Sequence, residues 1–190
     1  MAFHHGLPPA EQLQAIGMVS VEYQRLEAFI NTGIWGLSQI QEKDAASAMT
    51  APLNLRTRLN ILRALFRLGR DDENSNKTLE KICNRIEKVA KKRNKVVHAE
   101  WLRGDRDTAM MLSVTIRGGE LRQSRAATSA DWIAAIAKDI AEAAEKLEQF
   151  YDKYDVVEIK LETLPRLGAD GTCVRPEEPR APVQRFSGQE

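Results

Sequence analysis

The chain has 190 residues with a formal net charge of +1 at pH 7, and 43% of its residues are hydrophobic and 29% charged. This length fits one domain with some residues left for a tail, and the composition excludes a chain that is disordered throughout or embedded in a membrane. A net charge near zero excludes a protein that coats nucleic acid with its whole surface, so any such binding must come from a local basic patch.

The N-terminal residues contain no basic region followed by an apolar run, and no stretch of about 18 consecutive apolar residues occurs anywhere in the sequence. We therefore expect a cytoplasmic protein without membrane contact. His4 and His5 have no third ligand nearby in sequence, and the two cysteines lack metal-binding spacing. Cys83 falls in a predicted helix, where we expect it to be a small core residue.

The pattern of apolar residues in the N-terminal part of the chain predicts two amphipathic helices. From Leu13 to Leu37, apolar residues recur at steps of three and four, which predicts a long first helix. Gly33 and Gly36 are expected to weaken its last turns, and the small, polar segment 41–52 is expected to be a loop. A second, shorter helix carries the apolar residues Leu55, Leu59, Leu62 and Phe66.

The third predicted helix runs from about Lys77 to His98, and its second half is strongly basic. Arg93 lies on its apolar row, so a guanidinium occupies a position where the period predicts a core residue. A buried guanidinium is costly unless a partner pairs with it, and the candidate carboxylates are Glu27 and Glu100. The apolar row contains Leu79, Ile82, Ile86, Val89 and Val97, and a separate row contains Ala90, Asn94, His98 and Trp101.

A short β-hairpin is predicted after the third helix. Residues 102–107 are expected to form a charged turn, and Met110–Arg117 alternates apolar and polar residues as a strand does. Gly118 and Gly119 are expected to turn the chain into a short return strand, residues 120–123.

A fourth long helix and a tail complete the chain. Thr128 or Ser129 is expected to cap this helix, whose apolar stripe contains Trp132, Ile133, Ile136, Ile140, Ala144, Leu147, Tyr151 and Tyr154. The helical period fails beyond Val156, and four of the seven prolines follow among charged and small residues. Residues 157–190 bury too little apolar surface to offset their chain entropy, so we expect a disordered tail.

Four amphipathic helices with short connections predict an all-α fold. We expect an antiparallel four-helix bundle in residues 1–156, with the hairpin between helices three and four. Architecture alone names no function. The sequence contains no Walker loop, Rossmann glycine fingerprint, HExxH zinc motif or GxSxG nucleophile motif. We therefore expect no cofactor and no metal site.

Arg93, Asn94 and His98, in the stretch RNKVVH, resemble the Arg-x4-6-His motif of the HEPN superfamily, in which a polar residue often follows the arginine. The resemblance covers roughly residues 13–154 and includes the number of helices, the place of the motif near the end of the third long helix, the short insertion and the final long helix. It implies an all-α domain that forms a homodimer, with two motif copies in one cleft. Many members are metal-independent endoribonucleases of toxin–antitoxin and phage-defence systems.

The chemistry of RNA cleavage suits these residues, because a deprotonated 2′-hydroxyl can attack the adjacent phosphorus without a metal. The resemblance implies that His98 is the general acid/base, since an imidazole ordinarily titrates near neutrality. Arg93 would stabilise the phosphorane with its planar, permanently charged fork, and Asn94 would orient the ring or the phosphate. The residues expected to bind the RNA backbone are Lys91, Lys92, Lys95 and Arg103.

The spacing of Arg93 and His98 poses a geometric problem, because on an ideal helix the two side chains point about 140° apart. Either the helix loosens near its end, or Arg93 reaches toward the cleft along its stem, or a second protomer completes the site.

Each candidate residue also has a purely structural interpretation. His98 can interact with the helix dipole, Arg93 can pair with one of the two carboxylates, and the lysines can form a solvated helix face. The tryptophans are expected to be core or interface aromatics rather than base-stacking platforms: Trp35, Trp101 and Trp132. The alternative function is therefore a catalytically inactive HEPN-like binding or dimerisation module, which acts beside an antitoxin or a nucleotidyltransferase of a defence system.

Overall fold

The structure is a computed structural model that describes residues 3–40, 42–70, 72–104, 109–118, 120–156, 166–167 and 173–174. The chain divides into two compact units, Met1–Val157 and Glu158–Glu190. In the second unit, the short strands β5 (Arg166–Leu167) and β6 (Cys173–Val174) pair antiparallel. The rest of the tail that the sequence predicts to be disordered lies outside the described residues.

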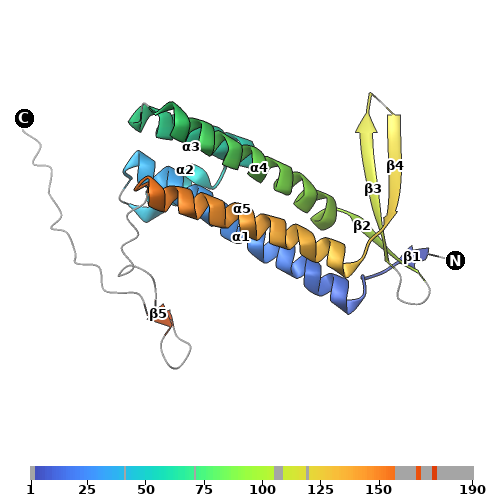
Figure 1. Cartoon of the computed structure of the whole chain (residues 1–190). Coiled ribbons are helices and arrows are strands. Elements are labelled where there is room, and N and C mark those ends of the chain that lie inside the picture. The colour runs from blue at the N-terminus through green and yellow to red at the C-terminus, as the bar shows by residue number, and fades with distance from the viewer. Residues whose placement is uncertain are drawn as a thin grey trace, which may run out of the picture. The chain divides into compact units, whose positions relative to one another are not determined.

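The described part of the first unit contains five helices: α1 (Ala10–Ser38), α2 (Lys43–Thr50), α3 (Leu55–Gly69), α4 (Glu73–Val97) and α5 (Ala130–Lys153) (Figure 1). The side chains of Asn54, Asp72 and Ser129 accept hydrogen bonds from backbone N–H groups in the first turns of α3, α4 and α5. These caps satisfy donors that the start of a helix leaves free. The four long helices and the cap at Ser129 confirm the sequence predictions.

Helix α2 occupies most of the segment that the sequence predicts to be a loop. Ala46 and Thr50 are buried, with 1% and 3% of their surface exposed. The indole Nε1 of Trp35, in α1, donates a hydrogen bond to Thr50 Oγ1 at 3.3 Å. The loop prediction is wrong here because a helix this short depends on tertiary contacts, which no local pattern reveals.

The long helices do not simply alternate in direction, so the predicted antiparallel bundle is wrong in this respect (Figure 1). Helix α3 runs in the same direction as α1: Arg58, near its start, contacts Glu27, whereas Phe66, near its end, lines one pocket with Leu37. The reason is the segment that contains α2, which returns the chain toward the middle of α1 before α3 begins.

Helix α5 is also parallel to α1. The side-chain amide of Gln12, near the start of α1, donates to the carbonyl of Thr128, just before α5, at 2.6 Å. Gly33, near the end of α1, packs against Tyr151, near the end of α5. Helix α4 runs in the opposite direction along α5, as the ion pairs Arg85–Glu142 and Lys92–Asp139 indicate.

The helices enclose one hydrophobic core. Cys83 is fully buried in it, as predicted. Trp132 is not, contrary to the predicted stripe: 43% of its surface is exposed, because Ile133, one position further round α5, faces the core. The largest side chains with less than 2% exposure are Phe66, Leu26, Ile30, Leu59, Leu62, Leu79, Ile86, Ile133, Ile140, Leu147, Val19 and Val96.

The fold is mostly helical rather than all-α, because a four-stranded antiparallel sheet in the order β1-β2-β3-β4 accompanies the helices. The predicted hairpin is confirmed, and its return strand extends further than expected. The predicted turn at 102–107 is wrong for residues 102–104, which belong to a strand paired on both sides, and residues 105–108 lie outside the described part. The strands are β1 (Phe3–His5), β2 (Glu100–Gly104), β3 (Ala109–Arg117) and β4 (Glu120–Ala127).

Candidate functional site at the end of helix α4

Helix α4 ends at Val97, and His98 is its C-cap residue, with φ −101° and ψ 7°. The backbone N–H of His98 still donates to the carbonyl of Asn94 at 3.1 Å, and strand β2 begins two residues later, at Glu100. His98 has therefore left the regular helix. Of the three ways to bring Arg93 and His98 together, the structure has the first, in which the helix loosens at its end.

The three residues of the RNKVVH stretch meet within one chain. Arg93 Nη1 donates to Asn94 Oδ1 at 3.1 Å and lies 3.2 Å from His98 Nε2. Because a guanidinium has only donors, this contact fits the imidazole tautomer whose Nε2 is the acceptor. Asn94 and His98 are exposed and Arg93 is half-buried, so a large polymeric substrate can reach the cluster.

The guanidinium of Arg93 lies over an aromatic ring. The guanidinium carbon lies 4.6 Å from the ring centroid of Tyr23, which is only 6% exposed. Burial raises the pKa of the Tyr23 hydroxyl, Glu27 raises this pKa further, and Arg93 and Arg58 act against the shift. The face of an aromatic ring attracts a cation, so Tyr23 offsets part of the cost of placing Arg93 on the buried row.

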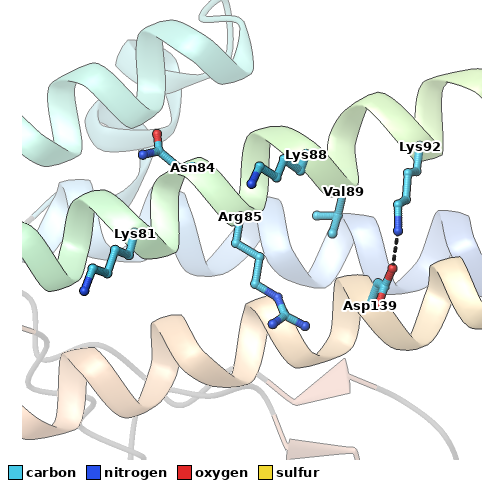
Figure 2. Close-up of a pocket in the computed structure, with 7 residues that line it drawn as sticks. All are labelled: Lys81, Asn84, Arg85, Lys88, Val89, Lys92 and Asp139. Atoms are coloured by element: carbon cyan, nitrogen blue, oxygen red, sulfur yellow. Dashed lines mark hydrogen bonds and ion pairs between the residues drawn. The ribbon is translucent and has the colours of Figure 1, made fainter.

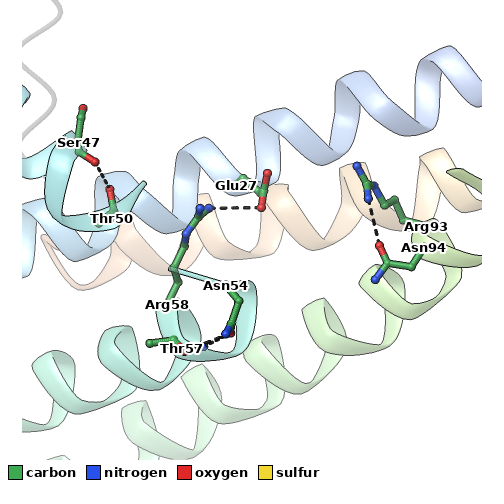
Figure 3. A network of polar contacts seen from close by, with 8 residues as sticks. All are labelled: Glu27, Ser47, Thr50, Asn54, Thr57, Arg58, Arg93 and Asn94. Carbon is green, nitrogen blue, oxygen red and sulfur yellow. Dashed lines mark hydrogen bonds and ion pairs between the residues drawn. The ribbon is translucent and has the colours of Figure 1, made fainter. Parts of the chain in front are cut away.

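Glu27, one of the two expected carboxylate partners, is engaged elsewhere. It accepts from Arg58 Nη1 at 3.3 Å, while Arg93 turns to Asn94 (Figure 3). Among the described residues, Arg93 has no ion pair with a carboxylate, and its buried Nε has no hydrogen-bond partner. Sequence reasoning missed Tyr23, which looked like an ordinary core residue. The available signal was an arginine on an apolar row, which needs a partner of some kind.

The residues expected to bind RNA fall into two groups. Lys91 and Lys95 are exposed on α4. Lys92 is also exposed, but its Nζ lies 2.6 Å from Asp139 Oδ2. Arg103 is half-buried in β2 and has interactions of its own. Among the described residues, Lys91 and Lys95 have no ion pair, so the uncompensated cations nearest to the cluster in sequence lie on α4.

Two of the three tryptophans pack against the core, as the structural interpretation expects. Trp101 packs against the core and is partly buried, and Trp35 both packs there and holds α2. Trp132 is not a core residue, since nearly half of its surface faces solvent, and its interface role stays a prediction.

Two further features concern only the part of the chain that the structure describes. No group of three or more His, Cys, Asp or Glu side chains there is arranged to hold a metal ion. None of the helices there has a stretch long and apolar enough to cross a bilayer. Comparisons of the chain with protein-family models, with curated proteins and with solved structures give no match.

Proposed function

We propose that the protein is a metal-independent endoribonuclease of HEPN type. The observation that carries the proposal is the contact of 3.2 Å between Arg93 Nη1 and His98 Nε2 at the exposed end of α4. It places a proton acceptor beside a permanent cation, which are the two groups that cleavage by a 2′-hydroxyl requires. The lack of a carboxylate partner for Arg93 among the described residues supports the same assignment, since its charge remains available for a phosphate.

In the proposed reaction, the substrate 2′-hydroxyl takes the place of Arg93 at His98 Nε2. The imidazole accepts its proton while the 2′-oxygen bonds to phosphorus, and Arg93 donates to the oxygens of the phosphorane. The bond from phosphorus to the 5′-oxygen then breaks, and this oxygen takes a proton from an acid on the opposite side. The products are a 2′,3′-cyclic phosphate and a 5′-hydroxyl. In a homodimer, the motif of the second protomer is the candidate for that acid.

The test is to incubate purified protein with end-labelled single-stranded RNA in EDTA. Wild type should cleave it, and His98→Ala and Arg93→Ala should each lower the rate by about 10²-fold or more. Arg93→Lys should stay impaired, because lysine keeps the charge but loses the planar fork. Mass spectrometry should find the cyclic phosphate, and equal residual activity in wild type and all variants would refute the enzyme.

The same assay tests whether the Arg93–His98 pair forms within one chain or between the two chains of a dimer. Because Arg93 and His98 meet within one chain, a mixture of the Arg93→Ala and His98→Ala variants contains no complete pair. We expect no recovery of cleavage in the mixture, and a recovery would show that the pair forms between chains.

A second candidate is a catalytically inactive HEPN-like binding or dimerisation module. One observation favours it: Arg93 Nη1 already contacts two acceptors, Asn94 and His98, and its guanidinium is stacked on Tyr23. These contacts are sufficient to stabilise the end of a helix without any catalytic role. On this view, Arg93→Ala lowers the stability of the protein, and wild type cuts no RNA in EDTA.

A further inference from the structure

Helix α4 carries a row of basic side chains on the face turned toward α5, and Lys92 is the one member of this row that is also among the residues expected to bind RNA. Lys81, Arg85, Lys88 and Lys92 recur at steps of four, three and four residues, so they lie in one row. Together they line a groove to which α5 contributes Asp139 (Figure 2). The row is about 16 Å long, so it suits an extended ligand better than a single small anion.

The groove carries excess positive charge. Arg85 pairs with Glu142 and Lys92 with Asp139, both at 2.6 Å, which holds these two side chains against α5. Lys81 and Lys88 have no ion-pair partner among the described residues. Two uncompensated ammonium groups therefore line the groove, and they favour a ligand that bears several negative charges along its length.

The row continues toward the candidate site. Lys95 follows Lys88 by seven residues, so it lies two turns further along the same face of α4, shortly before His98. Trp132 precedes Asp139 by seven residues, and because the helices run antiparallel it is displaced along α5 toward the same end. Its exposed indole can stack on a nucleic-acid base.

We propose that this groove, lined by Lys81, Arg85, Lys88 and Lys92, binds the phosphate backbone of single-stranded RNA and directs the strand toward His98. Only the cleavage that follows rests on the proposed function, since backbone binding requires charge alone. A single strand fits better than a duplex because only unpaired bases can stack on a side chain such as Trp132.

The probe is a fluorescein-labelled single-stranded oligoribonucleotide with 2′-O-methyl groups, which cannot be cleaved by 2′-hydroxyl attack. Its binding is followed by fluorescence anisotropy over a series of KCl concentrations. The Lys81→Gln/Lys88→Gln variant should bind about tenfold more weakly at low salt. Its slope of log affinity against log salt should be shallower by about 1.4, because each of the two lysines that neutralises a phosphate of a single strand adds about 0.7 to the slope.

Two further variants make the result specific. Arg56→Gln/Arg67→Gln removes the same charge from exposed positions of α3 that do not line the groove, and it should bind like wild type. Trp132→Leu should weaken binding by about fivefold or more without changing the salt slope, because stacking releases no counterions. Circular dichroism checks that each variant is folded.

Equal affinity of the two double variants would overturn the proposal, as would a failure of wild type to bind the probe. Competition by poly-glutamate as effective as that of RNA with equal charge would overturn the choice of RNA. If wild type binds through the groove but leaves unmodified RNA intact, the proposed function fails and the groove proposal stands. If wild type cleaves RNA while the groove variants bind the probe normally, the groove proposal fails and the proposed function stands.

Discussion

Arg93 lies on the apolar row of α4, yet the end of its side chain reaches the surface. Its guanidinium is stacked on the buried ring of Tyr23, while Nη1 contacts the exposed residues Asn94 and His98. Long basic side chains often bury the stem and expose the charged group. Here the guanidinium carbon lies 4.6 Å from the centroid of the buried Tyr23 ring, so under the proposed function Tyr23 would help to hold the group that acts on the phosphate.

Replacing Tyr23 tests this stacking. Tyr23→Leu removes the aromatic face and should lower the free energy of unfolding by roughly 1–3 kcal/mol, whereas Tyr23→Phe keeps the face and should stay close to wild type. Urea unfolding measures both. In a double-mutant cycle with Arg93→Ala, the coupling energy should be about 0.5–2 kcal/mol. A coupling energy of zero would contradict a direct interaction between ring and guanidinium.

At the scale of elements, helices α1 and α5 approach closely at a glycine. A Cβ at Gly33 would lie 2.1 Å from Tyr151 Oη and 2.4 Å from Tyr151 Cζ, so the absent side chain gives the Tyr151 ring its space. The sequence indicated only that Gly33 weakens the helix. Gly17 in the same helix has nothing within 4 Å of such a Cβ.

The two glycines should therefore respond in opposite ways to alanine. Gly33→Ala should lower the free energy of unfolding by about 1–3 kcal/mol through overpacking, although alanine favours a helix by up to about 1 kcal/mol. Gly17→Ala should raise it by up to about 1 kcal/mol. Thermal and urea unfolding measure both changes. Adding Tyr151→Phe to Gly33→Ala removes the closest clashing atom and should restore part of the loss, and equal effects at both glycines would refute the packing argument.

Local periodicity predicted the four long helices because an amphipathic stripe depends only on residues three and four positions apart. It did not predict β1 or β2, since these short strands are stabilised by pairing between Phe3–His5 and residues about a hundred positions later. Spacing identified Arg93 and His98. Their contact depends on His98 leaving the helix as its C-cap, and the stacking on Tyr23 depends on how α1 packs against α4. Neither property is local.

At the scale of the whole molecule, the core contains one thiol and two hydroxyl groups that stay protonated to a higher pH than they would in the unfolded chain. Burial raises the pKa of the Cys83 thiol from 9.0 to about 11 and raises the pKa values of the Tyr151 and Tyr23 hydroxyls above 10.0. In the unfolded chain, these groups lose their protons at lower pH. Above pH 9.0 the unfolded state therefore binds fewer protons than the folded state, and stability falls as pH rises.

Urea unfolding at pH 8 and pH 10.5 measures this dependence. The free energy of unfolding should be lower at the higher pH, and roughly 1–2 kcal/mol of the fall should belong to Cys83. Cys83→Ala should remove the part of this fall that belongs to the thiol, so the free energy of unfolding should depend less on pH. This holds for any loss of stability that the substitution causes at pH 8. Unchanged pH dependence in Cys83→Ala would show that the thiol titrates alike in both states.

The parallel packing of α1 against α5 joins parts of the chain that are made at different times. Gln12 and Thr128, which contact each other, are 116 residues apart, so a ribosome that adds about 5–20 residues per second makes them roughly 6–23 seconds apart. Until α5 emerges, α1 lacks the helix that contacts it at Gln12 and packs against it at Gly33. A nascent chain that ends before α5 therefore already contains Arg93 and His98 but lacks part of the packing around α1. Under the proposed function, cleavage would therefore begin only after α5 (Ala130–Lys153), which follows the Arg93–His98 pair in the chain, has been synthesised and packed.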